Sequence, residues 1–282
     1  MGVVADIERK LAGQRCRQKE DDLPDLRTST MTHLVWAPPE WFGRAKRVLD
    51  GLAERHPART IFLVPLPARS PKIEVNATVR AFSVDGNREL ISEVIEIRLH
   101  GTASRHPGSL VSPLLISDLP VFCRWRGRPD WRGTAFEELL DVADRLVVDS
   151  SEWGGGLPGA YAELARRFDH VSASDIAWRR TLPWRVALAD RWPGIRSLRR
   201  LSVEGPAADS LLLVGWLRSR LRRQVTLSRR GAQRVGAVRV DGEAVELPGA
   251  SGASGSDLLS AELDTYSRDP IYEAAVRAAG KA

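Results

Sequence analysis

Two histidines, His100 and His106, are the first residues in this chain of 282 whose type and spacing suggest chemistry. Five residues, one of them a glycine, separate them. A pair of imidazoles can chelate a metal, but this is not the spacing of two histidines on one helical turn, and no cluster of carboxylates accompanies them. We therefore expect both histidines to make hydrogen bonds in a loop, and we predict no metal site.

A glycine triplet, Gly154–Gly156, follows a predicted strand and precedes a predicted helix, which is the usual position of a phosphate-binding loop. It has neither the GxGxxG spacing nor the lysine–serine pair of a Walker motif. No GxSxG motif occurs either, so a serine hydrolase has no support in the sequence. We predict no catalytic residue and no cofactor. A nucleotide- or sugar-phosphate-binding α/β enzyme that uses Gly154–Gly156 is kept as an alternative.

Tryptophan is unusually frequent, with nine residues against three tyrosines and six phenylalanines. Several tryptophans adjoin arginine: Trp125 stands between two, and Trp131, Trp178 and Trp184 each precede one. Tryptophan and arginine are enriched in the hot spots of protein interfaces, because each offers a large contact area with a polar group. We therefore predict a surface that binds a protein partner. Its candidate contacts are Arg124, Arg126, Arg128, Trp131, Trp178 and Arg185.

The apolar run in Leu119–Trp125 indicates a buried strand, and the arginines that follow indicate that it ends at a charged loop. Alternation along a strand places Cys123 and Trp125 on one face and Arg124 and Arg126 on the other. We therefore expect Trp125 to be structural and the two arginines to reach the partner.

The formal net charge is +6, from 42 basic and 36 acidic residues. Because only five of the basic residues are lysines, and acidic residues are numerous along the chain, we treat the excess as an arginine bias of the genome. A nucleic-acid-binding module is a second alternative, and no nucleic acid partner is expected.

The two cysteines, Cys16 and Cys123, are too few and too far apart for a disulfide framework or a zinc site. We expect Cys123 to be a buried thiol and Cys16 an inert surface thiol. No apolar run approaches the ~20 residues of a membrane-spanning helix, and the N-terminus lacks the apolar core of a signal peptide. These features predict a cytoplasmic location and no membrane partner.

Strand and helix patterns alternate through the first half of the chain. The predicted elements are a helix at 5–21, strands at 32–37 and 59–64 around a helix at 39–54, a hairpin of 73–84 with 89–99, a short helix at 108–116, a strand at 119–125, a helix at 134–142 and a strand at 145–149. Asp85-Gly86-Asn87 supports the hairpin, since Asp-Gly supplies the positive φ angles that tight turns need. The last three elements predict a parallel crossover unit.

Residues 149–158 are the clearest flexible break, and we place the boundary between two lobes there. The second half predicts helices at 159–168, 175–192 with an interruption at Pro183, 208–223 and 257–279, and strands at 198–203, 225–227, 235–240 and 244–247. Ser172 with Asp175 resembles a capping box, and Thr181 can cap the helix after Pro183. We predict an α/β protein of two lobes, each a mixed sheet with flanking helices, the N-terminal lobe having a β-hairpin and a parallel crossover unit. The predicted domains are 1–31 (helix and connector), 32–150, and 159–282 with a helical tail.

Five stretches of the chain resemble the OpcA family: ARTIFLVPLP (58–67), LPVFCRWRGRP (119–129), DRLVVDSSEW (144–153), DIAWRRTLPWRVALADRW (175–192) and RDPIYEAA (268–275). This family comprises the glucose-6-phosphate dehydrogenase assembly proteins of actinobacteria and cyanobacteria. The resemblance implies a non-catalytic factor that binds glucose-6-phosphate dehydrogenase, promotes its active oligomer and raises its activity in the oxidative pentose phosphate pathway. The family has no established catalytic residues, so none is carried over.

The chain departs from the family in two respects. Cyanobacterial members are linked to thioredoxin control through cysteines, for which Cys16 and Cys123 show no counterpart role, and the chain is short before Thr32. Redox regulation is therefore not predicted. The sequence leaves open the stoichiometry, the surface that binds the dehydrogenase, and any modulating metabolite.

Overall fold

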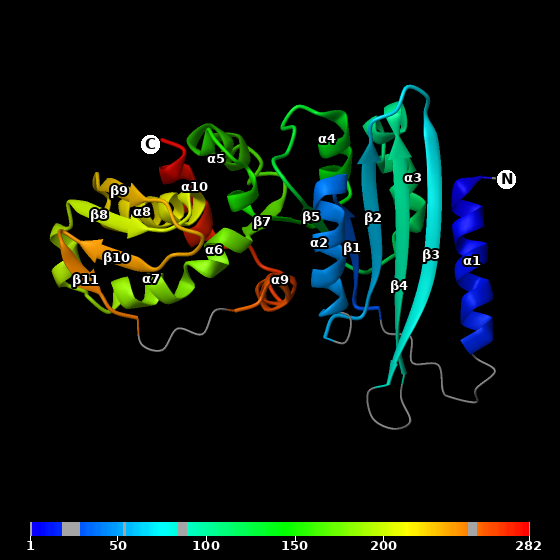
Figure 1. Ribbon diagram of the computed structural model, residues 1–282, viewed down its shortest axis with the longest axis horizontal. Coiled ribbons are helices and arrows are strands. Elements are labelled where there is room, and N and C mark those ends of the chain that lie inside the picture. Colours follow the sequence, from blue (N-terminus) through cyan, green and yellow to red (C-terminus); the bar gives the residue numbers. More distant parts are fainter. Residues whose placement is uncertain (1, 19–28, 53–54, 84–88, 248–252, 282) are drawn as a thin grey trace. The chain divides into compact units, whose positions relative to one another are not determined.

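A computed structural model describes residues 2–18, 29–52, 55–83, 89–247 and 253–281. The chain forms two compact units that divide between Val147 and Val148. Figure 1 labels most of their helices and strands. The first unit contains α1 (Val3–Gln18), β1 (Met31–Trp36), α2 (Pro39–Asp50), β2 (Ala58–Leu66), β3 (Lys72–Ser83), β4 (Glu89–His100), α3 (Gly108–Val111), β5 (Val121–Trp125), α4 (Thr134–Asp141) and β6 (Arg145–Val148), which reaches the boundary.

A mixed sheet organises the first unit, with the strand order β3-β4-β2-β1-β5-β6. β3 and β4 pair antiparallel, whereas all other neighbours in this series pair parallel. The predicted hairpin and the crossover unit of β5, α4 and β6 are thus confirmed. The predicted turn at Asp85-Gly86-Asn87 lies outside the described residues.

Helix α1 covers β3, as Figure 1 shows. Its predicted apolar side chains, Ile7 and Leu11, are fully buried. The amide of Gln14 donates to the carbonyl of Ala77 at 2.9 Å and accepts from the backbone N–H of Val79 at 2.7 Å. Because β3 is the outermost strand of this sheet, these bonds satisfy backbone groups that an edge strand would otherwise expose.

An ion pair explains an acidic residue that interrupts the apolar face of β4. Glu93 lies directly beside Arg59 on the neighbouring strand β2, and the two side chains are buried with 2.8 Å between Nε and Oε2. Arg59 also donates to the carbonyl of Leu114 at 2.8 Å. The two charges compensate each other inside the sheet, where a lone carboxylate would be costly.

The second unit contains α5 (Leu157–Ala165), β7 (Ser172–Asp175), α6 (Ile176–Arg180), α7 (Leu182–Ala189), β8 (Arg200–Glu204), α8 (Ala207–Leu221), β9 (Thr226–Arg230), β10 (Ala237–Val240), β11 (Glu243–Val245), α9 (Gly255–Leu263) and α10 (Pro270–Ala279). Its four-stranded sheet has the order β11-β10-β8-β9, and α7 and α8 share a buried apolar core with it. The sheet is mixed, because β9 pairs parallel with β8 while β10 pairs antiparallel with β8 and β11. Strand β9 therefore does not pair with β10, the next strand along the chain, but lies on the other side of β8.

Local structure around α6 and α7 differs from the predicted caps. Ser172 and Asp175 belong to strand β7 rather than to a capping box, and the Asp175 carboxylate caps α6 by accepting from the Ala177 N–H. Thr181 occupies the N-cap position of α7, but its hydroxyl donates to the Trp178 carbonyl instead of capping the helix. Trp192 does not share the buried face of α7, since the helix ends at Ala189 and the ring is 60% exposed.

Candidate functional site

The predicted contacts Arg124 and Arg126 are buried in the first unit. Strand β5 lies between β1 and β6, and every residue from Val121 to Trp125 is buried, so neither of its faces meets solvent. The Arg124 guanidinium donates to the carbonyls of Trp125 and Val147, at 2.8 and 3.3 Å. The Arg126 guanidinium lies 4.9 Å from the ring centre of Trp41. The alternation of faces is as expected, but parallel sheets are covered on both faces, and this buries the arginines as well.

Trp125 has the structural role that we expected. Its ring stacks on Trp36 at 4.8 Å and meets the edge of Phe136 at 5.0 Å. The predicted contact Trp131 packs against the same Phe136 at 5.5 Å and is buried. Arg128 is the exposed member of the predicted set in this unit.

The predicted contacts Trp178 and Arg185 belong to the second unit and touch each other. The Arg185 guanidinium lies 3.4 Å from the Trp178 ring centre, and the indole N–H donates to the Asp269 carboxylate at 2.9 Å. Burial lowers the pKa of Arg185 to about 10, an effect that Asp269 partly offsets. The structure thus groups these two residues, and partner binding through any of the six predicted residues stays a prediction.

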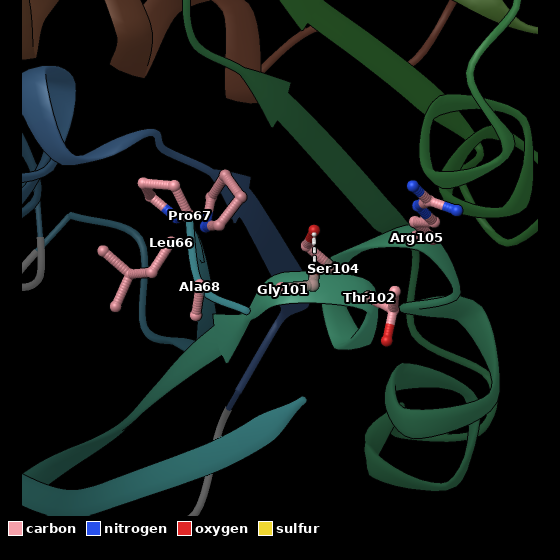
Figure 2. A pocket seen from close by; sticks show the side chains of 8 residues that line it. Leu66, Pro67, Ala68, Gly101, Thr102, Ser104 and Arg105 are labelled. Atoms are coloured by element: carbon pink, nitrogen blue, oxygen red, sulfur yellow. Dashed lines mark hydrogen bonds between the residues drawn. The ribbon is translucent and has the colours of Figure 1, made fainter. Parts of the chain in front are cut away.

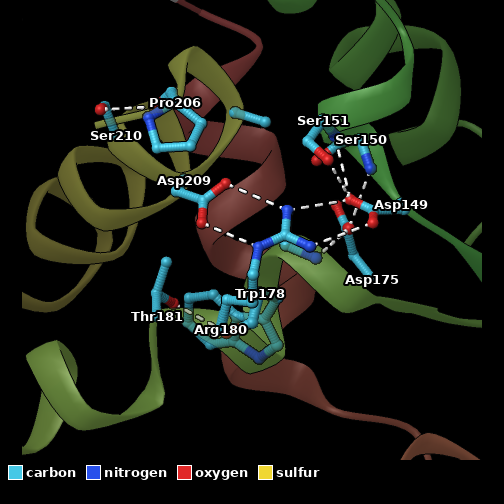
Figure 3. Close-up of polar contacts among 12 residues, drawn as sticks. Asp149, Ser150, Ser151, Asp175, Trp178, Arg180, Thr181, Pro206, Asp209 and Ser210 are labelled. Carbon is cyan, nitrogen blue, oxygen red and sulfur yellow. Dashed lines mark hydrogen bonds and ion pairs between the residues drawn. The ribbon is translucent and has the colours of Figure 1, made fainter. Parts of the chain in front are cut away.

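The second unit also encloses a charge cluster, consisting of Asp149, Asp175, Arg180 and Asp209. Figure 3 shows the Arg180 guanidinium between two carboxylates. It makes two 3.0 Å bonds to Asp149 and bonds of 3.1 and 3.2 Å to Asp209. Burial alone would lower the pKa of Arg180, but Asp149 and Asp209 reverse this and raise it. Since the three residues come from the end of β6, from α6 and from the first turn of α8, the cluster ties these segments together.

Asp175 is the least compensated member of the charge cluster. Its Oδ1 accepts from the backbone N–H groups of Ser150 and Ala177, at 3.0 and 2.8 Å. Its Oδ2 is buried, and the described residues offer it no hydrogen-bond partner. Burial, together with the negative charge of Asp149, raises the pKa of Asp175 to about 7. Such a carboxyl gains or loses a proton near neutral pH.

The segment that we predicted as a flexible break is packed into the second unit. Ser150 and Trp153 are buried, and the Tyr161 hydroxyl donates to the Ser150 hydroxyl at 2.9 Å. The glycine loop itself is exposed, with φ of +70° at Gly154 and Gly156. Pro158 lies in the first turn of α5 and has no N–H, so this helix start has one amide donor fewer for an anion.

An open pocket of about 520 Å³ lies where the adjacent parallel strands β2 and β4 end. Figure 2 shows its lining: Pro65, Leu66, Pro67, Ala68, Gly101, Thr102, Ser104 and Arg105. Ligands of open α/β sheets bind at such strand ends. Among the described residues that line it, Arg105 is the one with a charged side chain.

The two histidines singled out in the sequence have separate partners. His106 lies 2.8 Å from the Glu138 carboxylate, as expected for a loop histidine making a hydrogen bond. His100 ends β4 rather than lying in a loop, with Nε2 3.6 Å from Glu74. The described part of the chain contains no group of three or more histidine, cysteine or acidic residues placed to hold a metal. Cys123 is buried, as predicted, and burial raises the pKa of its thiol to about 12.

Two known domains match this chain and together cover most of it. Residues 50–167 match the "Glucose-6-phosphate dehydrogenase subunit N-terminal domain", and residues 171–276 match the corresponding C-terminal domain; both are domains of OpcA proteins. The chain belongs to the OpcA family. The resemblance predicted from the sequence is therefore confirmed.

Curated relatives of this OpcA family member come from cyanobacteria and are named OxPP cycle protein OpcA. The protein of Nostoc punctiforme is 28% identical over 190 residues, which cover 62% of this chain and 40% of that protein. The protein of Synechocystis sp. is 25% identical over 186 residues, covering 62% of this chain and 39% of that protein. This chain thus spans about two fifths of the length of these relatives. Within the residues described, no helix is long and apolar enough to cross a bilayer.

The motifs that carry the family resemblance supply the charge cluster. Asp149 comes from DRLVVDSSEW, and Asp175 and Arg180 come from DIAWRRTLPWR. From the sequence we predicted only a capping role for Asp175 and no role for Asp149, Arg180 or Asp209, although Asp149 and Asp209 each follow an apolar or small-residue stretch that predicts burial. An acidic residue at such a position needs a buried cation as partner, and this is the signal that could have found the cluster.

Proposed function

We propose that this chain is a non-catalytic assembly factor that binds glucose-6-phosphate dehydrogenase and acts as its allosteric activator in the oxidative pentose phosphate pathway. The observation that carries the proposal is the match of both OpcA domains, in order, over residues 50–167 and 171–276. The names of these domains describe a dehydrogenase subunit.

The chemistry of the described side chains supports a role without catalysis. In the charge cluster of the second unit, Arg180 bonds directly to the carboxylates of Asp149 and Asp209. Arg59 and Glu93 form a direct ion pair in the first unit. An active site, by contrast, needs a reactive group within reach of a substrate. The charged side chains of these ion pairs are therefore bonded to one another within the fold.

Activation by such a factor requires differential binding. The chain must bind the active state of the dehydrogenase more tightly than the inactive state, because equal binding shifts no equilibrium. A coupling of about 1–3 kcal/mol would change the dehydrogenase's affinity for its substrate by a factor of roughly 5 to 150.

The test is to mix the purified chain with the dehydrogenase of the same organism, and to measure reaction velocity and complex mass together. We expect a complex by light scattering and a velocity that rises saturably with chain concentration. A chain that forms no complex and leaves the velocity unchanged at every substrate concentration would refute the proposal. Turnover of a nucleotide or sugar phosphate by the chain alone would favour the enzyme alternative instead.

The partner-binding hypothesis for the six predicted residues needs two kinds of variant. Arg128→Ala changes an exposed side chain of the predicted set. Arg124→Ala removes a buried guanidinium, so a loss of activation in this variant would mix contact with stability. If Arg128→Ala and the half-buried Arg185→Ala both activate like the wild type, the partner surface lies elsewhere.

A further inference from the structure

Basic residues are concentrated in one segment of the second unit. Between residues 191 and 240 the chain has twelve arginines and only two acidic residues, Glu204 and Asp209, which gives a net charge of +10. The other 232 residues together have 30 basic and 34 acidic residues, a net charge of −4. A genomic preference for arginine over lysine does not remove acidic residues, so it leaves this asymmetry unexplained. Asp209 is also buried against Arg180 and adds no negative charge to the surface.

Three of these arginines lie on the outward face of the four-stranded sheet. Leu201, Val203, Val238 and Val240 point into the core, so the alternate residues of β8 and β10 point outward. Outward on this sheet lie three exposed arginines, Arg200 on β8, Arg230 on β9 and Arg239 on β10. Small residues separate these arginines on the outward face. Across the sheet, Ser202 on β8 pairs with Ser228 on β9 and with Arg239 on β10, and Arg239 pairs in turn with Ala244 on β11.

Three more exposed arginines lie near the end of the sheet where β8 and β9 begin. The Arg199 carbonyl accepts from the Thr226 N–H at 2.8 Å, which fixes the start of β9 beside Arg199. The Arg223 guanidinium donates to the Arg196 carbonyl at 3.0 Å, so these two residues are adjacent. All three of these arginine side chains are exposed. The arginine face is defined here as the outward arginines of the sheet, Arg200, Arg230 and Arg239.

The arginine face fits an acidic protein surface better than a nucleic acid. Strands β8 to β11 contain no aromatic residue, whereas sheets that bind single-stranded nucleic acids stack bases on aromatic rings. Glu204 also points outward and lies 4.0 Å from Arg230, so it offsets part of the positive charge of this face. Small side chains make the face flat, and arginine forms paired hydrogen bonds with carboxylates.

We infer that the arginine face is a docking surface for an acidic surface of a folded protein. The inference rests on the proposed function for the identity of that protein, the dehydrogenase. Concentrated like charge costs the isolated chain stability through repulsion, and partner carboxylates would relieve it. Such surfaces act chiefly on the association rate and on its dependence on salt.

The test compares two triple variants of the full chain. The first, called the sheet variant, combines Arg200→Gln, Arg230→Gln and Arg239→Gln and removes three charges from the arginine face. Arg44→Gln, Arg47→Gln and Arg132→Gln remove three exposed charges from the first unit and serve as the matched control. Because all six side chains are exposed, thermal unfolding should show that both variants remain folded.

Binding to the dehydrogenase is then measured at low and high salt. We expect the sheet variant to associate about tenfold more slowly than the wild type at low salt, with a smaller difference at high salt and an unchanged control. A wild-type complex that the sheet variant forms equally fast would overturn the inference and leave the proposed function standing.

A second probe separates the inference from the proposed function. The same proteins are titrated with poly-L-glutamate and with duplex DNA of equal total charge. We expect the wild type and the control to bind polyglutamate and the sheet variant to lose this binding. That result supports the docking surface even if the dehydrogenase does not bind. Tighter binding of DNA than of polyglutamate, or equal polyglutamate binding by all three proteins, overturns it.

Discussion

Replacing Asp175 with asparagine should remove a pH dependence from the stability of the protein. Burial and the charge of Asp149 raise the pKa of this carboxyl from 3.8 to about 7 in the folded state. The folded protein therefore holds the proton more tightly than the unfolded chain, and stability falls as the pH rises from roughly 4 to 7. Asparagine keeps an oxygen that can accept from the N–H groups of Ser150 and Ala177, and it stays neutral at every pH.

The size of the effect follows from the shift. A pKa that is about 3 units higher in the folded state corresponds to about 4 kcal/mol of stability lost when the carboxyl ionises, at 1.36 kcal/mol per unit. Roughly 60% of this loss occurs between pH 5 and pH 8, because the remainder occurs below pH 5. Between pH 5 and pH 8 the wild type should therefore lose about 2–3 kcal/mol of unfolding free energy that Asp175→Asn does not lose. The difference in unfolding free energy, variant minus wild type, should rise by that amount.

The assay is urea unfolding of both proteins at pH 5, 6, 7 and 8, followed by circular dichroism. Asp190→Asn, which neutralises an exposed carboxylate in the same unit, is the control and should differ from the wild type by a constant amount. A difference between Asp175→Asn and wild type that does not change with pH would refute the reasoning about this buried carboxyl.

Three further substitutions test the interior by urea unfolding. Arg180→Gln leaves two buried carboxylates without their cation and should cost about 3–5 kcal/mol; a loss below 1 kcal/mol would contradict the role of the charge cluster. Gly215→Ala would place a Cβ 2.4 Å from the Ala275 carbonyl oxygen, so α8 and α10 must separate, at about 1–3 kcal/mol; unchanged stability would argue against this close packing. Arg124→Ala should cost about 2 kcal/mol by removing buried hydrogen bonds to the Trp125 and Val147 carbonyls; a loss below about 0.5 kcal/mol would contradict the burial of Arg124.

The order and type of most elements could be predicted from the sequence, because their patterns are local. The hairpin of β3 and β4 follows from strict alternation over two long runs, and the crossover of β5 and β6 from strand, helix and strand in succession. The position of β9 could not be predicted this way, since its pairing with β8 joins segments that α8 separates. Local alternation predicts a strand but not its neighbour.

Burial of the charged residues was the least predictable part of the candidate site. A strand such as β5 reveals its two faces in the sequence, but only the sheet order shows that both faces are covered, and this decided the environment of Arg124. The partners of Arg180 come from residues 149 and 209, which no local pattern connects. The arginine face was within reach of the sequence, because counting charges in windows rather than over the whole chain exposes the excess between residues 191 and 240.

The central claim is that this chain activates glucose-6-phosphate dehydrogenase by preferring its active state, and reciprocal binding tests it most directly. The affinity of the chain for the dehydrogenase is measured with and without the sugar phosphate substrate, and the affinity of the dehydrogenase for that substrate is measured with and without the chain. The claim predicts that each ligand tightens the other by the same factor, roughly 5 to 150, since linkage is reciprocal. A chain that does not bind the dehydrogenase, or one whose affinity is unchanged by saturating substrate, would contradict it.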